Sequence, residues 1–114
     1  MLKKLAVLKA KQAAAAFRQA LEDGDPDVRI AAAWGIARLA DEAAVESLWR
    51  CAEAHAGWER INETDACLAL AEGLAAAGKK TAAIAMYEHL QQTRTDPSER
   101  HVREAASRRL LAAR

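Results

Sequence analysis

The segment that decides the fold is "DPDVRIAAAWGIARLADEAAVESLW", which runs from Asp25 to Trp49. Asp25 followed by Pro26 is typical of a helix start. Aspartate caps free backbone N–H groups, and proline lacks the N–H that the first helical position leaves unused. The first helix is expected to continue to Leu39, and Asp41 is placed to cap a second one. The segment therefore predicts a helical hairpin.

Similar residues that start or end helices divide the rest of the chain into segments. Gly24 and Gly78 are expected to form C-terminal turns, and Asp96 followed by Pro97 is expected to begin the last helix. Alanine, the strongest helix former, supplies most of the 52% hydrophobic content, whereas aromatic residues make up only 4%. The predicted class is therefore all-α. The expected helices cover 2–22, 26–39, 42–55, 65–76, 79–93 and the segment from 97, with a loop over 56–64.

One apolar spacing recurs along the chain. The sequences of the second, fourth and sixth expected helices align with one another at offsets of 38 and 36 residues. The apolar positions of the first, third and fifth helices also align with one another. Self-similarity at this period indicates stacked helical hairpins, each of which buries its apolar face against the next. Residues 1–114 are therefore expected to form a single α-solenoid domain of about three hairpins, with the first and last units incomplete. The matching sets are Val28, Ala66 and Val102; Ala32, Leu70 and Ala106; Ile36, Leu74 and Leu110; and Phe17, Leu48 and Met86.

The first hairpin also resembles a known family. "DPDVR", the small residues 31–33, the "AD" turn and "AAVESL" are similar to a HEAT repeat, and most similar to the short repeats of phycobilisome-lyase-like proteins. The resemblance covers about residues 13–52. Farther along, Gly78, Ala83 and Tyr87 give the C-terminal half a weaker resemblance to a tetratricopeptide unit. Both resemblances imply an α-solenoid that binds proteins or peptides. A chain this regular is also compatible with a designed or consensus-derived scaffold without a natural function.

Motifs for catalysis or cofactor binding are not found in the sequence. The five glycines are isolated, so no phosphate-binding loop is expected, and no serine is arranged with a histidine base. Cys51, His55 and Cys67 are the only hint of a metal site, and no further Cys or His at ligand spacing completes a tetrahedron. We therefore expect a non-enzymatic protein without metal or cofactor. Both thiols are expected to lie in the core of a cytoplasmic protein, because neither a signal peptide nor a transmembrane segment is predicted.

Charge is unevenly distributed. Residues 1–21 carry a net charge of +5, residues 22–77 carry −8 and residues 78–114 carry +4. The basic terminal helices offer nucleic-acid binding as an alternative function, because lysine and arginine neutralise phosphates. The acidic middle would repel a duplex laid along the solenoid, which makes nucleic acid the less favoured partner.

A protein partner is expected on the concave face, which the second helix of each hairpin usually lines. Trp49 and Tyr87 occupy equivalent positions there, and exposed aromatic residues flanked by charge often anchor interfaces. The alternative is that both rings pack between neighbouring helices. Trp58 marks a second candidate surface, on the expected loop and on the same edge as 93–101. The other residues predicted for the concave face are Arg18, Glu53 and Gln91.

The two ends of the solenoid are a further candidate interface. The last helix is expected to leave an apolar stripe uncovered, which self-association or further chain would shield. At the other end, Trp34 stands where the later repeats have Glu72 and Arg108. We expect Trp34 to be covered by the N-terminal extension of the first helix, which carries Leu2, Leu5 and Leu8, or by a second subunit. The alternative is a partner-binding role. The stripe consists of Val102, Ala106, Leu110 and Leu111.

Overall fold

The computed structural model describes residues 2–113, with side chains from Lys9 onward, and this part of the chain contains helices and turns but no strand. The predicted all-α class is thus confirmed. No helix in the described part is both long and apolar enough to span a bilayer. The elements are α1 (Leu2–Ala20), α2 (Pro26–Leu39), η1 (Glu42–Ala44), α3 (Val45–Glu53), α4 (Gly57–Ala76), α5 (Lys80–Thr93), η2 (Pro97–Glu99) and α6 (Arg100–Ala113).

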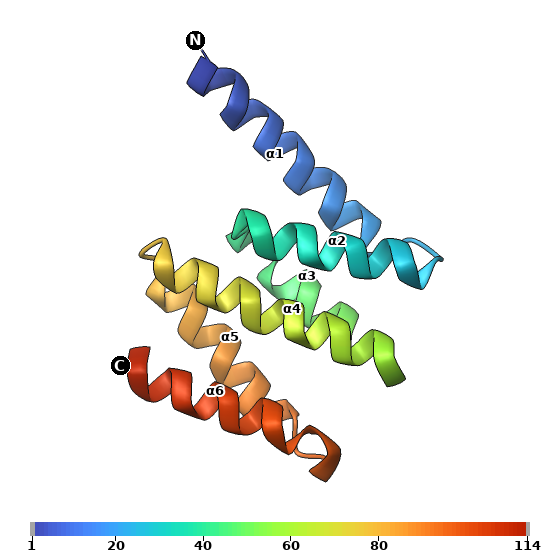
Figure 1. The fold of residues 1–114 in the computed structure, drawn as a ribbon, viewed down its shortest axis with the longest axis vertical. Coiled ribbons are helices and arrows are strands. Elements are labelled where there is room, and N and C mark those ends of the chain that lie inside the picture. The colour runs from blue at the N-terminus through green and yellow to red at the C-terminus, as the bar shows by residue number, and fades with distance from the viewer. Residues whose placement is uncertain (1, 114) are drawn as a thin grey trace.

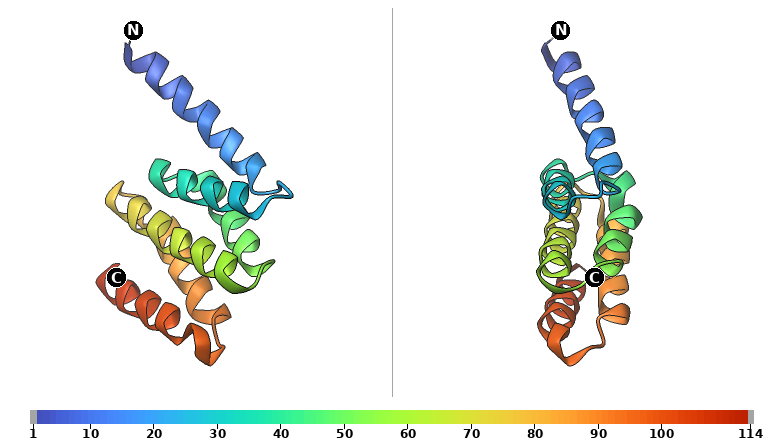
Figure 2. Two further views of the ribbon diagram at one scale, coloured as in Figure 1. Left: turned by 45° about the vertical axis from the view of Figure 1, so that its right-hand side comes forward. Right: turned by 90° about the vertical axis from the view of Figure 1, so that its right-hand side faces the viewer.

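The helices form two layers. α2, α4 and α6 run parallel to one another in one layer, and α3 and α5 lie in the other (Figures 1 and 2). The Cα atoms span 49 × 36 × 15 Å, and the shortest extent corresponds to the thickness of the two layers. α4 lies at the centre and packs on α2, α3 and α5. This arrangement of stacked hairpins agrees with the predicted solenoid.

Helix α1 packs on the rest of the protein only through its C-terminal part. Its N-terminal half projects away from α2 (Figure 1). A β-carbon at Gly35 would lie 2.6 Å from the ring of Phe17, so this glycine lets the ring rest on the backbone of α2. Contact between α1 and α2 therefore depends on a close approach near Phe17.

The predicted repeat register agrees with the observed burial. Two of the aligned sets are fully buried. In the set from the first, third and fifth helices, Leu48 and Met86 are fully buried and Phe17 is half-buried. Val28 departs from its set, because its equivalents are buried while its own side chain is exposed. The spacing seen in the sequence thus corresponds to the apolar face that each helix buries. The two fully buried sets are Ala32, Leu70 and Ala106, and Ile36, Leu74 and Leu110.

The predicted aspartate caps are present. The side chains of Asp25, Asp41 and Asp96 each accept a hydrogen bond from the backbone N–H two residues later, at 2.9, 3.2 and 2.8 Å respectively. Asp25 caps α2 directly. Asp41 and Asp96 cap the 3-10 turns η1 and η2, which lead into α3 and α6. A short polar side chain thus begins each of these segments.

The expected loop over 56–64 is wrong. α4 starts at Gly57 and runs for 20 residues, so this segment forms its first two turns. These turns bury Glu59 and Glu63, whose partners come from distant parts of the chain. Because buried carboxylates occupy the inward face, the sequence shows no apolar period there and resembles a polar loop.

The expected bare stripe on the last helix is also wrong. Val102, Ala106 and Leu110 are buried, and α6 packs on α5 and α4. Only Leu111 is exposed, with 81% of its surface accessible. The three residues face back into the two-layer stack and not out from its end. Self-association remains a prediction, but this stripe no longer supports it.

The two glycines expected in C-terminal turns differ. Gly78 has a φ of +83°. It ends α4 in a Schellman motif, with Gly78 N–H donating to the Ala75 carbonyl and Lys79 N–H to the Leu74 carbonyl. Gly24 does not have a positive φ, and it lies four residues beyond Ala20, the last residue of α1, so it does not form the C-terminal turn expected of it.

The alanine variants of these glycines are expected to behave differently. Gly78→Ala should lower the free energy of unfolding by about 1 kcal/mol, because a β-carbon is strained in the left-handed region. Neither glycine has an atom within 4 Å of an added β-carbon, so Gly24→Ala is a matched control that should be neutral or slightly stabilising. Urea denaturation measures both. Equal stability of the two variants would contradict the assigned turn.

Candidate functional site

A cluster of polar side chains lies where α3 ends and α4 begins. Cys51 is on the last turn of α3, His55 is in the following turn, and Glu59 and Glu63 are one turn apart on α4. Arg29 reaches the cluster from α2. Three successive elements therefore supply one group of titratable side chains at the boundary between two hairpins.

The distances within this cluster are short. The Cys51 thiol donates to Glu63 Oε2 at 3.4 Å, and Cys51 Sγ lies 4.0 Å from His55 Nδ1. His55 Nδ1 also lies 2.6 Å from the Cys51 carbonyl oxygen, 3.2 Å from Glu59 Oε2 and 3.3 Å from Glu63 Oε1. The imidazole nitrogen thus has three oxygen atoms and one sulfur atom around it.

Burial and charge affect each group of the cluster differently. Desolvation is the main cause that raises the pKa of Glu63 to about 7 and that of Cys51 to about 12. A bidentate pair with Arg29, at 2.7 and 2.8 Å, lowers the pKa of Glu59 below its usual value. Near pH 7, Glu59 is therefore ionised, Cys51 is a thiol and Glu63 titrates.

Sequence reasoning identified only part of this cluster. Cys51 and His55 do come together, but Cys67 is not part of the group that could hold an ion. The third ligand is Glu63. It was missed because its segment was taken for a loop, whereas a helix starting at Gly57 would have placed Glu59 and Glu63 on one face.

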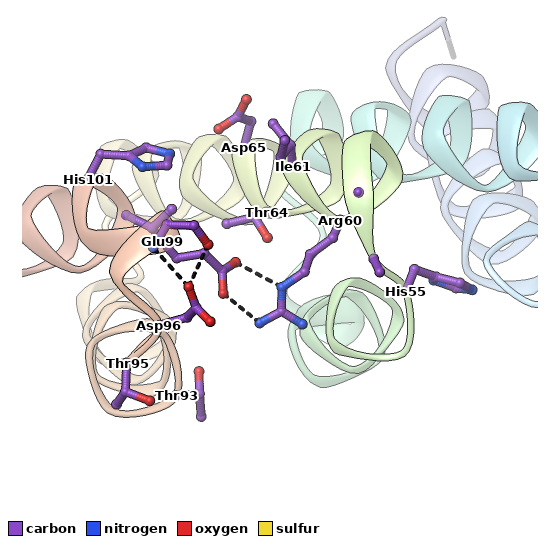
Figure 3. Close-up of a pocket in the computed structure, with 14 residues that line it drawn as sticks. His55, Arg60, Ile61, Thr64, Asp65, Thr93, Thr95, Asp96, Glu99 and His101 are labelled. Atoms are coloured by element: carbon purple, nitrogen blue, oxygen red, sulfur yellow. Dashed lines mark hydrogen bonds and ion pairs between the residues drawn. The ribbon is translucent and has the colours of Figure 1, made fainter.

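A second polar cluster joins α4 to the turn before α6. Glu99 accepts two hydrogen bonds from Arg60, at 2.8 and 2.9 Å (Figure 3). It accepts a third from Arg94 at 3.2 Å. Arg94 is fully buried, and its Nε and one terminal nitrogen have no partner among the described residues. The Glu99 carboxylate therefore binds two guanidinium groups.

A cavity of about 540 Å³ lies beside this second cluster, between the N-terminal half of α4 and the start of α6. Figure 3 shows Arg60 pointing toward Glu99, whereas Ile61 and Asp65 point to the opposite side of α4. Asp65 and Asp96 line the cavity together with His55 and His101, and Glu99 is already paired with Arg60. The cavity thus has an apolar edge at Ile61 and two acidic groups.

Two exposed apolar side chains lie on the N-terminal half of α4, and one of them, Ile61, lines this cavity. Trp58 and Ile61, three residues apart on α4, expose 57% and 56% of their surfaces. Trp58 therefore lies on an exposed helix face and not on the loop expected from the sequence. An apolar pair bordered by polar groups is typical of a surface that binds another protein.

The predicted aromatic pair on the α3–α5 layer is only partly present. Trp49 is half-buried and stacks on His89, with ring centroids 3.9 Å apart and planes 8° from parallel. Tyr87 is 2% exposed, so its prediction as a surface anchor is wrong. α5 is packed between α4 and α6, and this packing covers the phenol ring. The partner-binding role of Trp49 remains a prediction.

The charged and polar residues predicted for the same face have partners within the chain. Arg18 pairs with Asp41 at 2.5 Å, Glu53 pairs with His89, and Gln91 donates to Ser107 at 3.0 Å. These contacts join neighbouring helices. Their binding role is untested, and a partner at this face would meet side chains that are already engaged.

Trp34 is exposed, and the N-terminal extension predicted to cover it has side chains that are not described. The Trp34 side chain is 36% exposed, and the N-terminal half of α1 diverges from α2 (Figure 1). The side chains of Leu2, Leu5 and Leu8 lie outside the described residues. Cover by a second subunit remains a prediction.

The basic residues of α6 are partly neutralised. Arg100 pairs with Glu104 one turn later, and Arg109 pairs with Glu72 on α4. These pairs reduce the positive potential that the helix would present to phosphates. Nucleic-acid binding therefore stays the less favoured alternative.

The comparisons with known proteins agree with the stacked hairpins. Residues 1–69 match the family described as HEAT repeats, and this match covers more than half of the 114 residues. The chain belongs to the HEAT-repeat family. No curated protein and no solved structure matches it.

Proposed function

We propose that this chain is a non-enzymatic protein-interaction module that binds its partner through the exposed surface of α4. HEAT repeats generally serve as scaffolds for other proteins. The observation that carries the choice of surface is the exposure of Trp58 and Ile61 beside a cavity. Large apolar side chains cost solubility when exposed, and aromatic residues are enriched among those that dominate binding energies.

The surroundings of this pair define the chemistry of the partner. Asp65 lies one turn beyond Ile61, and Asp96 borders the same cavity. An apolar side chain of the partner would pack on Trp58 and Ile61, and a neighbouring lysine or arginine would pair with the carboxylates. The expected partner is therefore a protein segment that combines an apolar anchor with positive charge.

Affinity capture from cells that contain the protein tests this proposal. Trp58→Ala combined with Ile61→Ala is expected to lose most of the captured partner, because the shared apolar anchor is gone. Leu111→Ala removes an even more exposed apolar side chain from the distant end of α6, and it should capture as much as the wild type. Quantitative mass spectrometry compares the three.

Two results would contradict the proposal. Equal capture by the double variant and by Leu111→Ala would remove the α4 surface from consideration. Recovery of nucleic acid that elutes with moderate salt, without a dependence on Trp58 or Ile61, would favour the basic terminal helices instead.

The predictions about repeat subtype, location and self-association are separate from this test. The resemblances to phycobilisome-lyase-type repeats and to a tetratricopeptide unit, a cytoplasmic location, and self-association stay predictions. A designed scaffold without a natural partner would show no capture that depends on Trp58 and Ile61.

A further inference from the structure

We propose that Cys51, His55 and Glu63 form a binding site for a divalent transition-metal ion, with zinc as the expected occupant. Their ligand atoms lie within 4.8 Å of one another. The three residues come from α3, the turn after it and α4, so a bound ion would join two consecutive hairpins at their boundary.

The separations among these atoms are close to those of a tetrahedral site. Ligands about 2.0–2.3 Å from a zinc ion lie about 3.3–3.6 Å from each other. Cys51 Sγ lies 3.4 Å from Glu63 Oε2, and His55 Nδ1 lies 3.3 Å from the other oxygen of the same carboxylate, Oε1. Cys51 Sγ lies 4.0 Å from His55 Nδ1, and the imidazole must turn to bind an ion, because an unprotonated Nδ1 cannot keep its 2.6 Å contact with the Cys51 carbonyl oxygen. The fold already places the three groups next to one another.

Without an ion, the cluster has more acceptors than donors. His55 Nδ1 carries at most one proton, yet three oxygen atoms lie within 3.3 Å of it. Glu63 is completely buried, and among the described residues its Oε1 forms no hydrogen bond, although His55 Nδ1 lies 3.3 Å away. A buried carboxylate oxygen without a partner is costly, and a cation among these atoms would satisfy it.

The nature of the ligands favours zinc. A thiolate, an imidazole and a carboxylate together suit zinc better than magnesium or calcium, which prefer oxygen ligands only. Glu59 Oε2, held in place by Arg29, lies 3.2 Å from His55 Nδ1 and would supply the fourth ligand or orient a water molecule there. Zinc and Arg29 would balance the negative charges of Cys51, Glu59 and Glu63.

Binding also has a defined proton balance. The Cys51 thiol must lose its proton to solvent to become the ligand, and His55 must bind through an unprotonated Nδ1 with its proton on Nε2. The imidazole side chain is one-quarter exposed, which gives the ion a route from solvent. Because the other ligands are buried, the role expected of the ion is to stabilise the hairpin boundary.

Cobalt(II) titration of the full chain, after treatment with a chelator, tests the site. Sulfur-to-cobalt charge-transfer absorption is expected to saturate at about one ion per chain, and zinc should abolish it by displacement. Zinc should also raise the Tm, because it binds only the folded state. Isothermal titration calorimetry with zinc gives the stoichiometry independently.

Variants decide whether the assigned residues are the ligands. Cys51→Ala should abolish the charge-transfer band and weaken zinc binding by at least about 100-fold. Cys67→Ala, which removes a buried thiol outside the cluster, should retain both. Glu63→Gln keeps the size of the side chain and should weaken binding at least about tenfold, so the test holds even if Cys51→Ala fails to fold.

The assignment fails if the wild-type chain shows no charge-transfer band and no zinc binding. It also fails if Cys51→Ala or Glu63→Gln binds like the wild type, or if Cys67→Ala alone loses the band. Glu59 and Glu63 do not line the cavity beside the proposed partner surface, whereas His55 does. All of these outcomes are measured on the isolated chain, so none of them depends on the partner proposed for the α4 surface.

Discussion

Replacing Glu99 with alanine is expected to lower the free energy of unfolding by about 3 kcal/mol. Glu99 accepts hydrogen bonds from both Arg60 and Arg94, and Arg94 is fully buried. Its guanidinium group remains charged, although desolvation lowers its pKa. The alanine variant would leave this charge buried without its carboxylate. Urea denaturation followed by circular dichroism measures the loss.

Arg94→Met is the control for this interpretation. It removes the buried charge and keeps a side chain of similar length, so it should cost much less than Glu99→Ala or even stabilise the protein. In the Arg94→Met background, the further change Glu99→Ala should also cost less. Equal costs of Glu99→Ala in both backgrounds would show that the ion pair is not the cause.

The pH dependence of stability gives a second check on Glu99. Its pKa is lowered from 4.5, chiefly by the hydrogen bond from Arg60 and further by the charge of Arg94. The unfolded chain therefore binds a proton at a higher pH than the folded one, so the contribution is present above about pH 4.5 and is lost as pH falls through the folded pKa. The acid-side fall in stability should be smaller in Glu99→Gln than in the wild type.

Leu70→Ala is expected to have an effect of similar or larger size, about 3–5 kcal/mol. Leu70 is completely buried near the middle of α4, the helix that packs on α2, α3 and α5. Removing its branched side chain loses transfer free energy and leaves a cavity that several helices would have to close. Thermal and urea denaturation measure the change.

Trp58→Ala is the matched substitution on the same helix. Although tryptophan is larger than leucine, more than half of this side chain is exposed, so the variant should change stability by less than about 1 kcal/mol. A loss as large as that of Leu70→Ala would mean that Trp58 belongs to the core. The proposed partner surface would then lose its main residue.

The features that local chemistry determines were predictable from the sequence. An aspartate cap followed by proline specifies the start of a helix whatever surrounds it, and Asp25 and Asp96 begin the expected segments. The repeat spacing also predicted burial correctly at Leu70 and Ile36, because each hairpin buries the same face. Helix-capping residues and the repeat spacing of apolar residues therefore account for the hairpins.

The errors arose where distant residues supply the partner. Glu59 and Glu63 look like loop residues until Arg29 and Cys51, 30 and 12 residues away, are brought against them. Tyr87 shares its repeat position with Trp49, but α5 is packed between α4 and α6 and its ring is covered. An alignment of the repeats gives equivalent positions in each repeat. It does not show which repeat has another helix packed against that position.

Site-specific photo-crosslinking tests the proposed interaction surface most directly. A photoreactive amino acid would replace Trp58 in one form of the protein and Leu111 in another, since both positions are exposed and apolar. Crosslinking in cells should join position 58, and not position 111, to one defined protein whose attached segment carries an apolar anchor and a basic residue. Absence of a crosslinked protein at position 58, or the same products at both positions, would contradict the proposal that this HEAT-repeat chain binds its partner through α4.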